Sequence, residues 1–337
     1  MTNQDRNNSN SPLVGFDPEF RDLDHYIRVI TERIWEGRRI DDIHKYYSDP
    51  CVVETPASVT TTVADVVDGT KRTLAQFPDR RLLAEDIIQS GDAVGGFLSS
   101  HRIISTMTHL GEGDFGAATG KRIHVRTIAD CVCKQNRIIH EWLVRDQSAI
   151  ALQIGVSPQT LAQRWLDTKP GWSKPRIPDS PAGYRSALTD DPVACAYASA
   201  LTQFATQKLT PDGMARTYDD AVHQLGPGGV TRYGHAEVGH YWQTLFAIFA
   251  PRQFDIEHLA VNRGDGRADR IAVRWRAQTR HIGQPTSQFG RASGNAVEIM
   301  GINHVECWRG RVLREWVLID EIALWMQVLG GRPENHP

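Results

Sequence analysis

The sequence predicts an α+β protein made of two similar domains in tandem. Each half begins with amphipathic helices and continues with a run of strands, which is typical of helices packed on one face of an antiparallel sheet. Both halves also end in nearly the same phrase, RIIHEWLVRD at 137–146 and RVLREWVLID at 311–320. The offset between Arg137 and Arg311 is 174 residues, which is the size of a whole domain rather than of a solenoid unit. We therefore expect one α+β unit used twice, each with a curled antiparallel sheet.

Composition narrows the class of protein further. A length of 337 residues fits two domains, and 40% hydrophobic residues allow each half its own core. The net charge of −2 and the lack of a basic stripe make nucleic acid an unlikely class of partner. Five cysteines at no framework spacing indicate reduced thiols. The first 15 residues contain no apolar core of a signal peptide, and no apolar run is long enough to cross a membrane, so we expect a cytoplasmic protein.

The elements of the first half follow from periodicity. Apolar residues recur at three- and four-residue steps from Asp22 to Gly37, which predicts the long first helix. Further helices are expected at 40–47 and 63–77, with a short strand at 51–54 between them. The expected later elements are strands at 81–90, 93–107, 123–133 and 137–147, and a closing helix at 148–154.

The second half repeats this order, with helices expected at 193–208, 210–218, 235–249 and 322–329, and strands at 253–262, 270–280, 296–308 and 311–321. Proline, glycine and serine between the halves indicate a semi-extended connection, most clearly at 167–186. The expected boundaries are a disordered tail at 1–15, a first domain at 16–156, a linker at 157–190 and a second domain at 191–330.

Several segments resemble a known family. These are His109-Leu110-Gly111, Phe115 to Lys121, the helix end Phe77-Pro78-Asp79 and the closing stretch Arg137 to Gly155. They are similar to the signatures of SnoaL-like, polyketide-cyclase-like proteins of the NTF2-like superfamily. The second half keeps the closing stretch but lacks the Thr-Gly-Lys of residues 119–121. The resemblance implies two tandem NTF2-like cone-shaped barrels, whose interiors hold a small ligand. It does not imply one reaction, because the superfamily includes cyclases, isomerases, dehydratases, epoxide hydrolases and binding modules.

Asp146 and Asp320 are the first candidates for catalysis. Alternation along the last strand places each aspartate on the same face as a tryptophan, Trp142 or Trp316. Poor solvation there would raise the carboxyl pKa towards the working pH of an acid/base group. The resemblance implies the same role, because polyketide cyclases of this type use an aspartate at this position. The alternative is that each aspartate caps the closing helix, and the two roles are compatible.

Polar residues on the penultimate strand are the next candidates. His304 and Glu306 share one face, and the first half has Asp130 in the corresponding region. A strict two-residue turn at Arg309-Gly310 would turn His304 and Glu306 away from Asp320, unless a β-bulge intervenes. We leave both orientations open. The second half has more of these acid/base candidates on its last two strands than the first half has. We therefore expect the two interiors to differ and one ligand to bind per chain.

The remaining candidates are possible contacts to substrate, namely Trp142, Trp316, Tyr26, Tyr197, His101 and His109. No metal site is expected, and no glycine-rich nucleotide motif is present, so we expect no cofactor. The resulting hypothesis is a cofactor-free acid/base enzyme of cyclase, isomerase, dehydratase or hydratase type, acting on a small carbonyl- or hydroxyl-bearing substrate through an aspartate in an apolar cone. The alternative is a non-catalytic module that binds a ligand or dimerises. The two halves are expected to pair internally, with homodimerisation as a further option.

Overall fold

The computed structural model describes residues 13–175, 188–264 and 266–330, which form two compact units. Of the described residues, the first unit contains those up to Arg145 together with Pro175, and the second contains Asp146–Lys174 and those from Leu188 onwards. Within the described ranges, no helix is both long and apolar enough to cross a bilayer.

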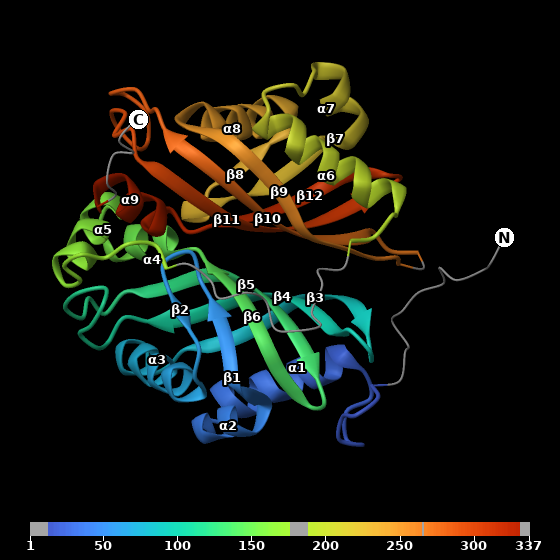
Figure 1. Cartoon of the computed structure of the whole chain (residues 1–337), viewed down its shortest axis with the longest axis vertical. Coiled ribbons are helices and arrows are strands. Elements are labelled where there is room, and N and C mark those ends of the chain that lie inside the picture. Colours follow the sequence, from blue (N-terminus) through green and yellow to red (C-terminus); the bar gives the residue numbers. More distant parts are fainter. Residues whose placement is uncertain (1–12, 176–187, 265, 331–337) are drawn as a thin grey trace, which may run out of the picture. The chain divides into compact units, whose positions relative to one another are not determined.

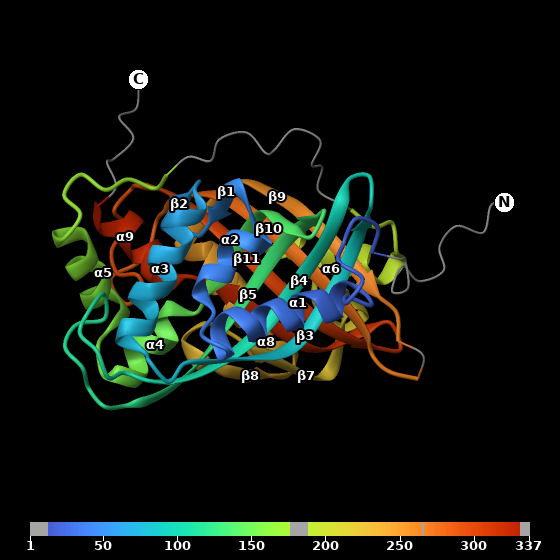
Figure 2. The same cartoon turned by 90° about the horizontal axis from the view of Figure 1, so that it is seen from below.

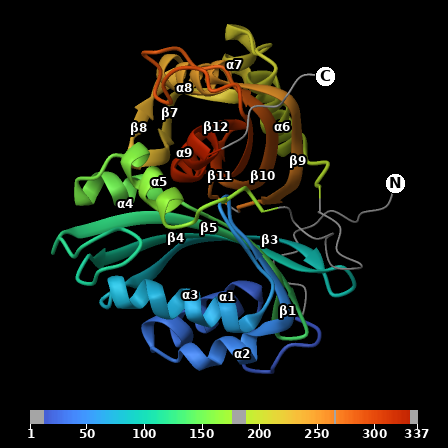
Figure 3. The same cartoon turned by 60° about the vertical axis from the view of Figure 1, so that its left-hand side comes forward.

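The first unit is a six-stranded sheet with helices on one face (Figures 1 and 3). Strand order is β2-β1-β6-β5-β4-β3. Figure 2 looks onto the helices of this unit and shows α1 running across the strands. The elements are α1 (Leu23–Thr31) with a π-helical continuation (Glu32–Glu36), a 3-10 turn (Ile40–Asp42), α2 (Ile43–Tyr46), β1 (Tyr47–Glu54), β2 (Val59–Thr60), α3 (Val63–Gln76), β3 (Arg81–Asp92), β4 (Gly96–Thr108), β5 (Arg122–Lys134) and β6 (Arg137–Arg145).

The second unit repeats this topology, with strand order β8-β7-β12-β11-β10-β9. β6 and β12 hold equivalent positions, as the repeated phrase predicts. Its elements are α4 (Gln147–Ile154), α5 (Pro158–Asp167), α6 (Pro192–Ala205), α7 (Pro211–Thr217), β7 (Tyr218–Leu225), a 3-10 turn η4 (Pro227–Gly229), β8 (Thr231–Tyr233), α8 (Gly234–Ile248), β9 (Phe249–Asn262), β10 (Asp269–His281), β11 (Ala296–Trp308), β12 (Arg311–Ile319) and α9 (Glu321–Gly330).

Both sheets are mixed, whereas the sequence pattern predicted purely antiparallel sheets. β1 pairs with β6 in parallel, and β7 pairs with β12 in parallel. The short strand that follows each set of first helices therefore joins the edge of the last strand. The α+β class and the tandem arrangement are confirmed.

The division between the units differs from the predicted boundary at 156. α4 and α5 follow the last strand of the first sheet, yet they belong to the second unit, where α5 packs against α9. The range 157–190 also contains an ordered helix, because Ser157 caps α5 and Pro158 occupies its first turn. Residues 176–187 of the predicted linker and 1–12 of the predicted tail lie outside the described residues. Leu13, also predicted to be in the tail, packs partly buried against the first core.

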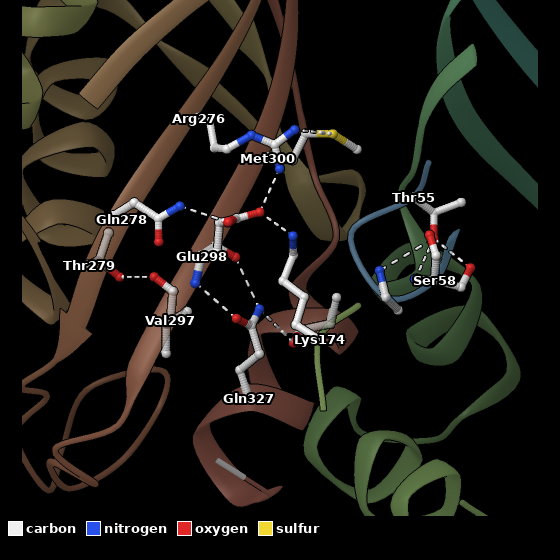
Figure 4. A network of polar contacts seen from close by, with 12 residues as sticks. Thr55, Ser58, Lys174, Arg276, Gln278, Thr279, Val297, Glu298, Met300 and Gln327 are labelled. Carbon is white, nitrogen blue, oxygen red and sulfur yellow. Dashed lines mark hydrogen bonds and ion pairs between the residues drawn. The ribbon is translucent and has the colours of Figure 1, made fainter. Parts of the chain in front are cut away.

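A polar network joins β10, β11 and α9 of the second unit (Figure 4). Lys174 and Arg276 both form ion pairs with the Glu298 carboxylate, whose pKa falls to about 2 because these two charges outweigh the effect of burial. The Gln327 side chain exchanges two hydrogen bonds with the backbone of Glu298, at 2.8 and 3.0 Å. These bonds tie α9 and the segment after α5 to β11. Because the network joins four separate segments of the second unit, we assign it a structural role.

The helices of the first unit define which side of its sheet faces the core. Tyr26, Ile27 and Ile30 of α1 form one cluster with Ala129, Cys131 and other residues of the strands. Since side chains alternate along a strand, the neighbours of these core residues point to the opposite face. We call the helix-facing side chains of β4, β5 and β6 the first interior, and those of β10, β11 and β12 the second interior.

Candidate active site

Glu141 is the carboxylate of the first interior. It lies on β6 opposite Cys131, a core residue, and shares the helix-facing side with Leu143. Its Oε2 accepts a hydrogen bond from Tyr47 Oη at 2.9 Å. Burial raises the pKa of Glu141 to about 7, against the opposing effects of the Tyr47 bond and of the Arg145 charge. A carboxylate has about four acceptor positions, so one bond leaves most of its capacity for another molecule.

Polar side chains of β4 and β5 face the same interior. Ser99 lies in the same row as Cys131 and Glu141, and His101 lies in the next row, opposite Ala129. His101 Nε2 and Thr127 Oγ1 are buried and have no hydrogen-bond partner among the described residues. Such orphaned groups in a core call for a missing partner, such as a water or a ligand.

His101 is neutral at physiological pH. Burial, assisted by the charge of Arg28, lowers its pKa to about 3. His101 and Glu141 belong to neighbouring rows, where a row is the set of residues paired across β4, β5 and β6. Since β5 separates β4 from β6, strand geometry puts the Cα atoms of His101 and Glu141 about 12 Å apart, which leaves a few ångströms between the ends of their side chains. A neutral imidazole and a carboxyl of raised pKa thus face one interior.

The second interior holds an equivalent carboxylate in a different state. Glu315 accepts hydrogen bonds from Tyr197 Oη at 2.6 Å, Tyr218 Oη at 3.0 Å and Gln224 Nε2 at 2.8 Å. Burial raises its pKa, and these bonds oppose the rise. The donors already occupy both carboxylate oxygens, so Glu315 is a fully held structural group.

Aromatic rings fill the rest of the second interior. Trp275 lies opposite Gly301, and a Cβ on Gly301 would be 2.2 Å from the Trp275 ring. The Trp275 ring also packs on Trp242, Phe246 and Phe254. The indole therefore occupies the space above β11.

Equivalent positions show how the two interiors differ. Arg102 pairs with Glu85 as Arg274 pairs with Glu257, which aligns β4 with β10 at an offset of 172 residues. On this alignment β10 carries apolar side chains where β4 carries polar or smaller ones: Ile271 for Ser99, Val273 for His101, Trp275 for Ile103 and Ala277 for Ser105. The polar candidate site, consisting of Glu141, His101, Thr127 and Ser99, is therefore specific to the first unit.

Asp146 and Asp320 lie just after the last strands and cap helices. Asp146 Oδ1 accepts from Ala149 N at 3.0 Å and Gly228 N at 3.0 Å, and its Oδ2 accepts from Gly229 N at 3.2 Å. Asp320 Oδ1 accepts from Ile322 N at 3.0 Å and Ala323 N at 3.2 Å. Burial raises the pKa of both, that of Asp320 to about 7, although the capping bonds oppose this. The capping contacts weighed from the sequence are present, and neither aspartate lies on the helix-facing side of a strand.

Replacing Asp146 by alanine should destabilise the protein. The variant leaves the amides of Ala149, Gly228 and Gly229 without their acceptor. Loss of an N-cap alone costs about 1 kcal/mol, and the two glycine amides add to this, so we expect a loss of about 2 kcal/mol in the free energy of unfolding. Denaturant titration measures it. An unchanged midpoint would show that the capping contacts contribute nothing.

The other catalytic candidates from the sequence lie on the face opposite the helices. A β-bulge does occur in the last hairpin, and it places Glu306 opposite Arg314 and His304 opposite Trp316. This brings His304 and Glu306 to the face of Trp316, but Val305 and Glu315 are the residues that face the second interior. Glu306 forms an ion pair with Arg314 at 2.8 Å.

The same holds in the first sheet. Asp130 lies opposite Trp142, and both point away from the helices. Asp130 accepts a hydrogen bond from Ser100 Oγ, and the Trp142 ring stacks on His140 at 3.9 Å. The expectation that Trp142, Trp316, Asp130, His304 and Glu306 line the ligand-holding interiors is therefore not met by the strand register.

The remaining candidates have structural partners. Tyr26 Oη donates to Asn136 O at 3.0 Å, and Tyr197 holds Glu315. His109 Nδ1 lies 3.2 Å from Thr119 Oγ1, and His281 Nδ1 lies 3.0 Å from Ser293 Oγ, which shows the same loop contact in both units. Of the predicted substrate contacts, His101 is the one that lies on the helix-facing side of β4, β5 or β6, as Glu141 does.

The sequence interpretation missed Glu141 and Glu315, although both belong to the repeated phrase. Their signal was a carboxylate conserved between the two halves at the position before the tryptophan. No group of three or more metal-ligating side chains is present within residues 13–175, 188–264 and 266–330.

Comparison with known proteins agrees with this architecture. A family model for SnoaL-like polyketide cyclases matches residues 26–154, and a model for SnoaL-like domains matches residues 199–315. No curated protein matches the chain.

Solved structures match one domain at a time. IdmH, a proposed polyketide cyclase from Streptomyces antibioticus, is 20% identical over 40% of this chain and 98% of its own, with a TM-score of 0.35. A SnoaL-like polyketide cyclase from Agrobacterium tumefaciens is 20% identical over 40% of this chain and 98% of its own, with a TM-score of 0.33. AclR, a proposed hydroxylase from Streptomyces galilaeus, is 20% identical over 39% and 94%, with a TM-score of 0.35. The two family matches identify the chain as a tandem of two SnoaL-like domains.

Proposed function

We propose that the first domain is an acid/base enzyme acting on a small organic substrate, with Glu141 as the group that moves the proton. One observation carries this proposal: Glu141 is a buried carboxyl of raised pKa that faces the first interior with one hydrogen-bond donor among the described residues, whereas its counterpart Glu315 accepts from three. Membership of the SnoaL-like family supports a small-molecule substrate.

The geometry suits chemistry next to a carbonyl group. The Glu141 carboxylate takes a proton from the carbon beside the carbonyl, and the C–H electron pair moves to the carbonyl oxygen as an enolate. His101 or Thr127 would donate a hydrogen bond to that oxygen. Return of the proton elsewhere gives isomerisation, attack of the enolate carbon on a second carbonyl gives cyclisation, and loss of a β-hydroxyl gives dehydration. A pKa near 7 serves both halves of this proton transfer.

Tyr47 has a positioning role in this scheme. Its hydroxyl fixes Oε2 of Glu141, which leaves Oε1 as the oxygen for the substrate. The second domain, with its filled interior, has a supporting role, so one ligand binds per chain. This places the site in the opposite half from the one that residue counting in the sequence favoured.

Exchange of the substrate's proton beside the carbonyl for deuterium tests the proposal, and it requires no knowledge of the final product. Small ketones and hydroxy acids are first screened by thermal shift. Those that bind are then incubated with the protein in D₂O, and loss of the signal of the proton beside the carbonyl is followed by NMR. Wild-type protein should catalyse the exchange, and Glu141→Gln should slow it by about 10²- to 10⁴-fold.

Three matched variants separate the alternatives. Glu315→Gln, Asp146→Asn and Asp320→Asn should each retain exchange, provided that the variant is folded. If Asp146→Asn or Asp320→Asn abolishes exchange while Glu141→Gln does not, the capping aspartate is the proton-transfer group. Ligands that bind to wild type without any exchange favour the alternative function, a binding module.

A further inference from the structure

Arg80 is a buried cation of the first unit, and among the described residues it forms no ion pair with a carboxylate. It lies in the turn between α3 and β3, directly before Arg81, and the residue is 5% exposed. In the part of the chain that the structure describes, its guanidinium bonds only to Ser105 Oγ, from Nε and Nη2, both at 3.4 Å. These are long hydrogen bonds, and an unpaired buried charge costs folding free energy. Such a group requires an explanation beyond packing.

The surroundings of Arg80 are positive. Burial lowers its pKa, and the charges of Arg145 and Arg38 lower it further. The one acidic group that acts in the opposite direction is Glu36, which already binds Arg81 Nε at 3.0 Å and the Leu82 amide at 2.6 Å. An anion from outside the chain would therefore be attracted to this corner.

Arg80 points into the first interior. Its partner Ser105 follows His101 and Ile103 on the helix-facing side of β4, where successive residues alternate in direction without a bulge against β5. Thr127, whose hydroxyl is orphaned, lies opposite both Ile103 and Arg145. We call Arg80 and Ser105 the arginine corner. This corner and Glu141 thus belong to the same helix-facing side of the first sheet.

The second unit shows that the fold does not need this arginine. At the offset of 172 residues, Arg80 corresponds to Arg252, which is exposed, and Ser105 corresponds to Ala277. The position of Arg145 is occupied by Ile319. The same architecture therefore forms without a buried cation at the position of Arg80, so the arginine corner is a special feature of the first domain.

We propose that Arg80, together with Ser105, binds a carboxylate group of the substrate of the first domain. The planar guanidinium fork matches the two oxygens of a carboxylate. Ser105 and Glu141 lie on β4 and β6, which are separated by β5, and their rows are three apart, so their Cα atoms are about 22 Å apart. The substrate class is therefore an extended keto acid with its carboxylate at the arginine corner and its acidic C–H at Glu141, and a short keto acid fills the carboxylate end alone. This inference rests on the proposed function for the identity of the site.

Thermal shift with 4-oxopentanoate, its methyl ester and inorganic phosphate tests the inference at constant ionic strength. The variants are Arg80→Met, which keeps the length and removes the charge, Arg80→Lys, which keeps the charge, and Arg252→Met as the matched control. The keto acid should raise the melting temperature of wild type and Arg252→Met in a saturable manner, and the ester should not. Arg80→Met should bind the keto acid at least tenfold more weakly, and Arg80→Lys should be intermediate.

Two further readouts decide between binding and structure. Without ligand, Arg80→Met should melt at or above the wild-type temperature, because it no longer buries an unpaired charge. A large loss of stability would show that Arg80 is a structural cation and would overturn the proposal, as would equal responses of wild type and Arg80→Met to the keto acid. A response to phosphate alone would also overturn it. Glu141→Gln should keep the response to the keto acid, so failure of the carboxylate site and failure of the proton-transfer role can be told apart.

Discussion

The double variant Ile103→Trp, Thr127→Gly should lose ligand binding while remaining folded. It copies into the first interior the pair that fills the second, because Ile103 lies opposite Thr127 as Trp275 lies opposite Gly301. The glycine is required, since any Cβ at position 301 would meet the Trp275 ring. The new indole would cover the row between His101 and the arginine corner.

We expect at least a hundredfold weaker binding of any ligand found by screening, about 2.7 kcal/mol. Isothermal titration calorimetry measures the affinity, and thermal melting reports the fold. Ile103→Leu, which conserves volume, is the control and should bind as wild type does. A folded double variant with wild-type affinity would place the ligand somewhere other than the first interior.

Glu141→Gln should make the protein more stable than wild type at alkaline pH. The folded-state pKa of Glu141 is about 7, above its ordinary value of 4.5. Between these two values the native state keeps a proton that the unfolded chain has lost, so the stability of wild type falls as pH rises, and above pH 7 the full cost is present. A neutral glutamine buries no charge, so its variant does not lose this stability.

The size of the effect follows from the difference between the folded-state pKa of about 7 and the ordinary pKa of 4.5, which corresponds to about 3 kcal/mol. The free energy of unfolding of the variant, relative to wild type, should therefore increase by about that amount between pH 5 and pH 9. Urea titrations at the two pH values measure it. A difference between variant and wild type that stays constant across this range would mean that Glu141 is not desolvated. Activity lost together with stability gained is the pattern expected of a functional group held at a cost to the fold.

Most of the fold could be predicted from the sequence. The helix periodicity from Asp22 to Gly37 and the repeated closing phrase are local signals, and each corresponds to an observed element. The parallel pairing of β1 with β6, and of β7 with β12, was not predictable in this way, because each pair joins segments about 90 residues apart in the sequence.

The candidate site was harder to predict, for a physical reason. Alternation shows which residues of a strand share a face, but it does not show which of the two faces meets the helices. Glu141 and Trp142 are neighbours, so choosing the wrong face exchanges one candidate set for the other. The bulge between Glu306 and Cys307 adds a further shift. Arg80 carries no sequence signal at all, because its burial depends on the long-range contact with Ser105 on β4.

A direct titration of Glu141 tests the central claim that this carboxyl is a desolvated acid/base group in the first interior. The side-chain carboxyl carbon of glutamate is labelled with ¹³C, and its NMR signal is followed with pH in the folded protein. Comparison with Glu141→Gln assigns the resonance by its absence. We predict a midpoint near pH 7 for Glu141. A midpoint near the ordinary glutamate value of 4.5 would contradict a desolvated carboxyl.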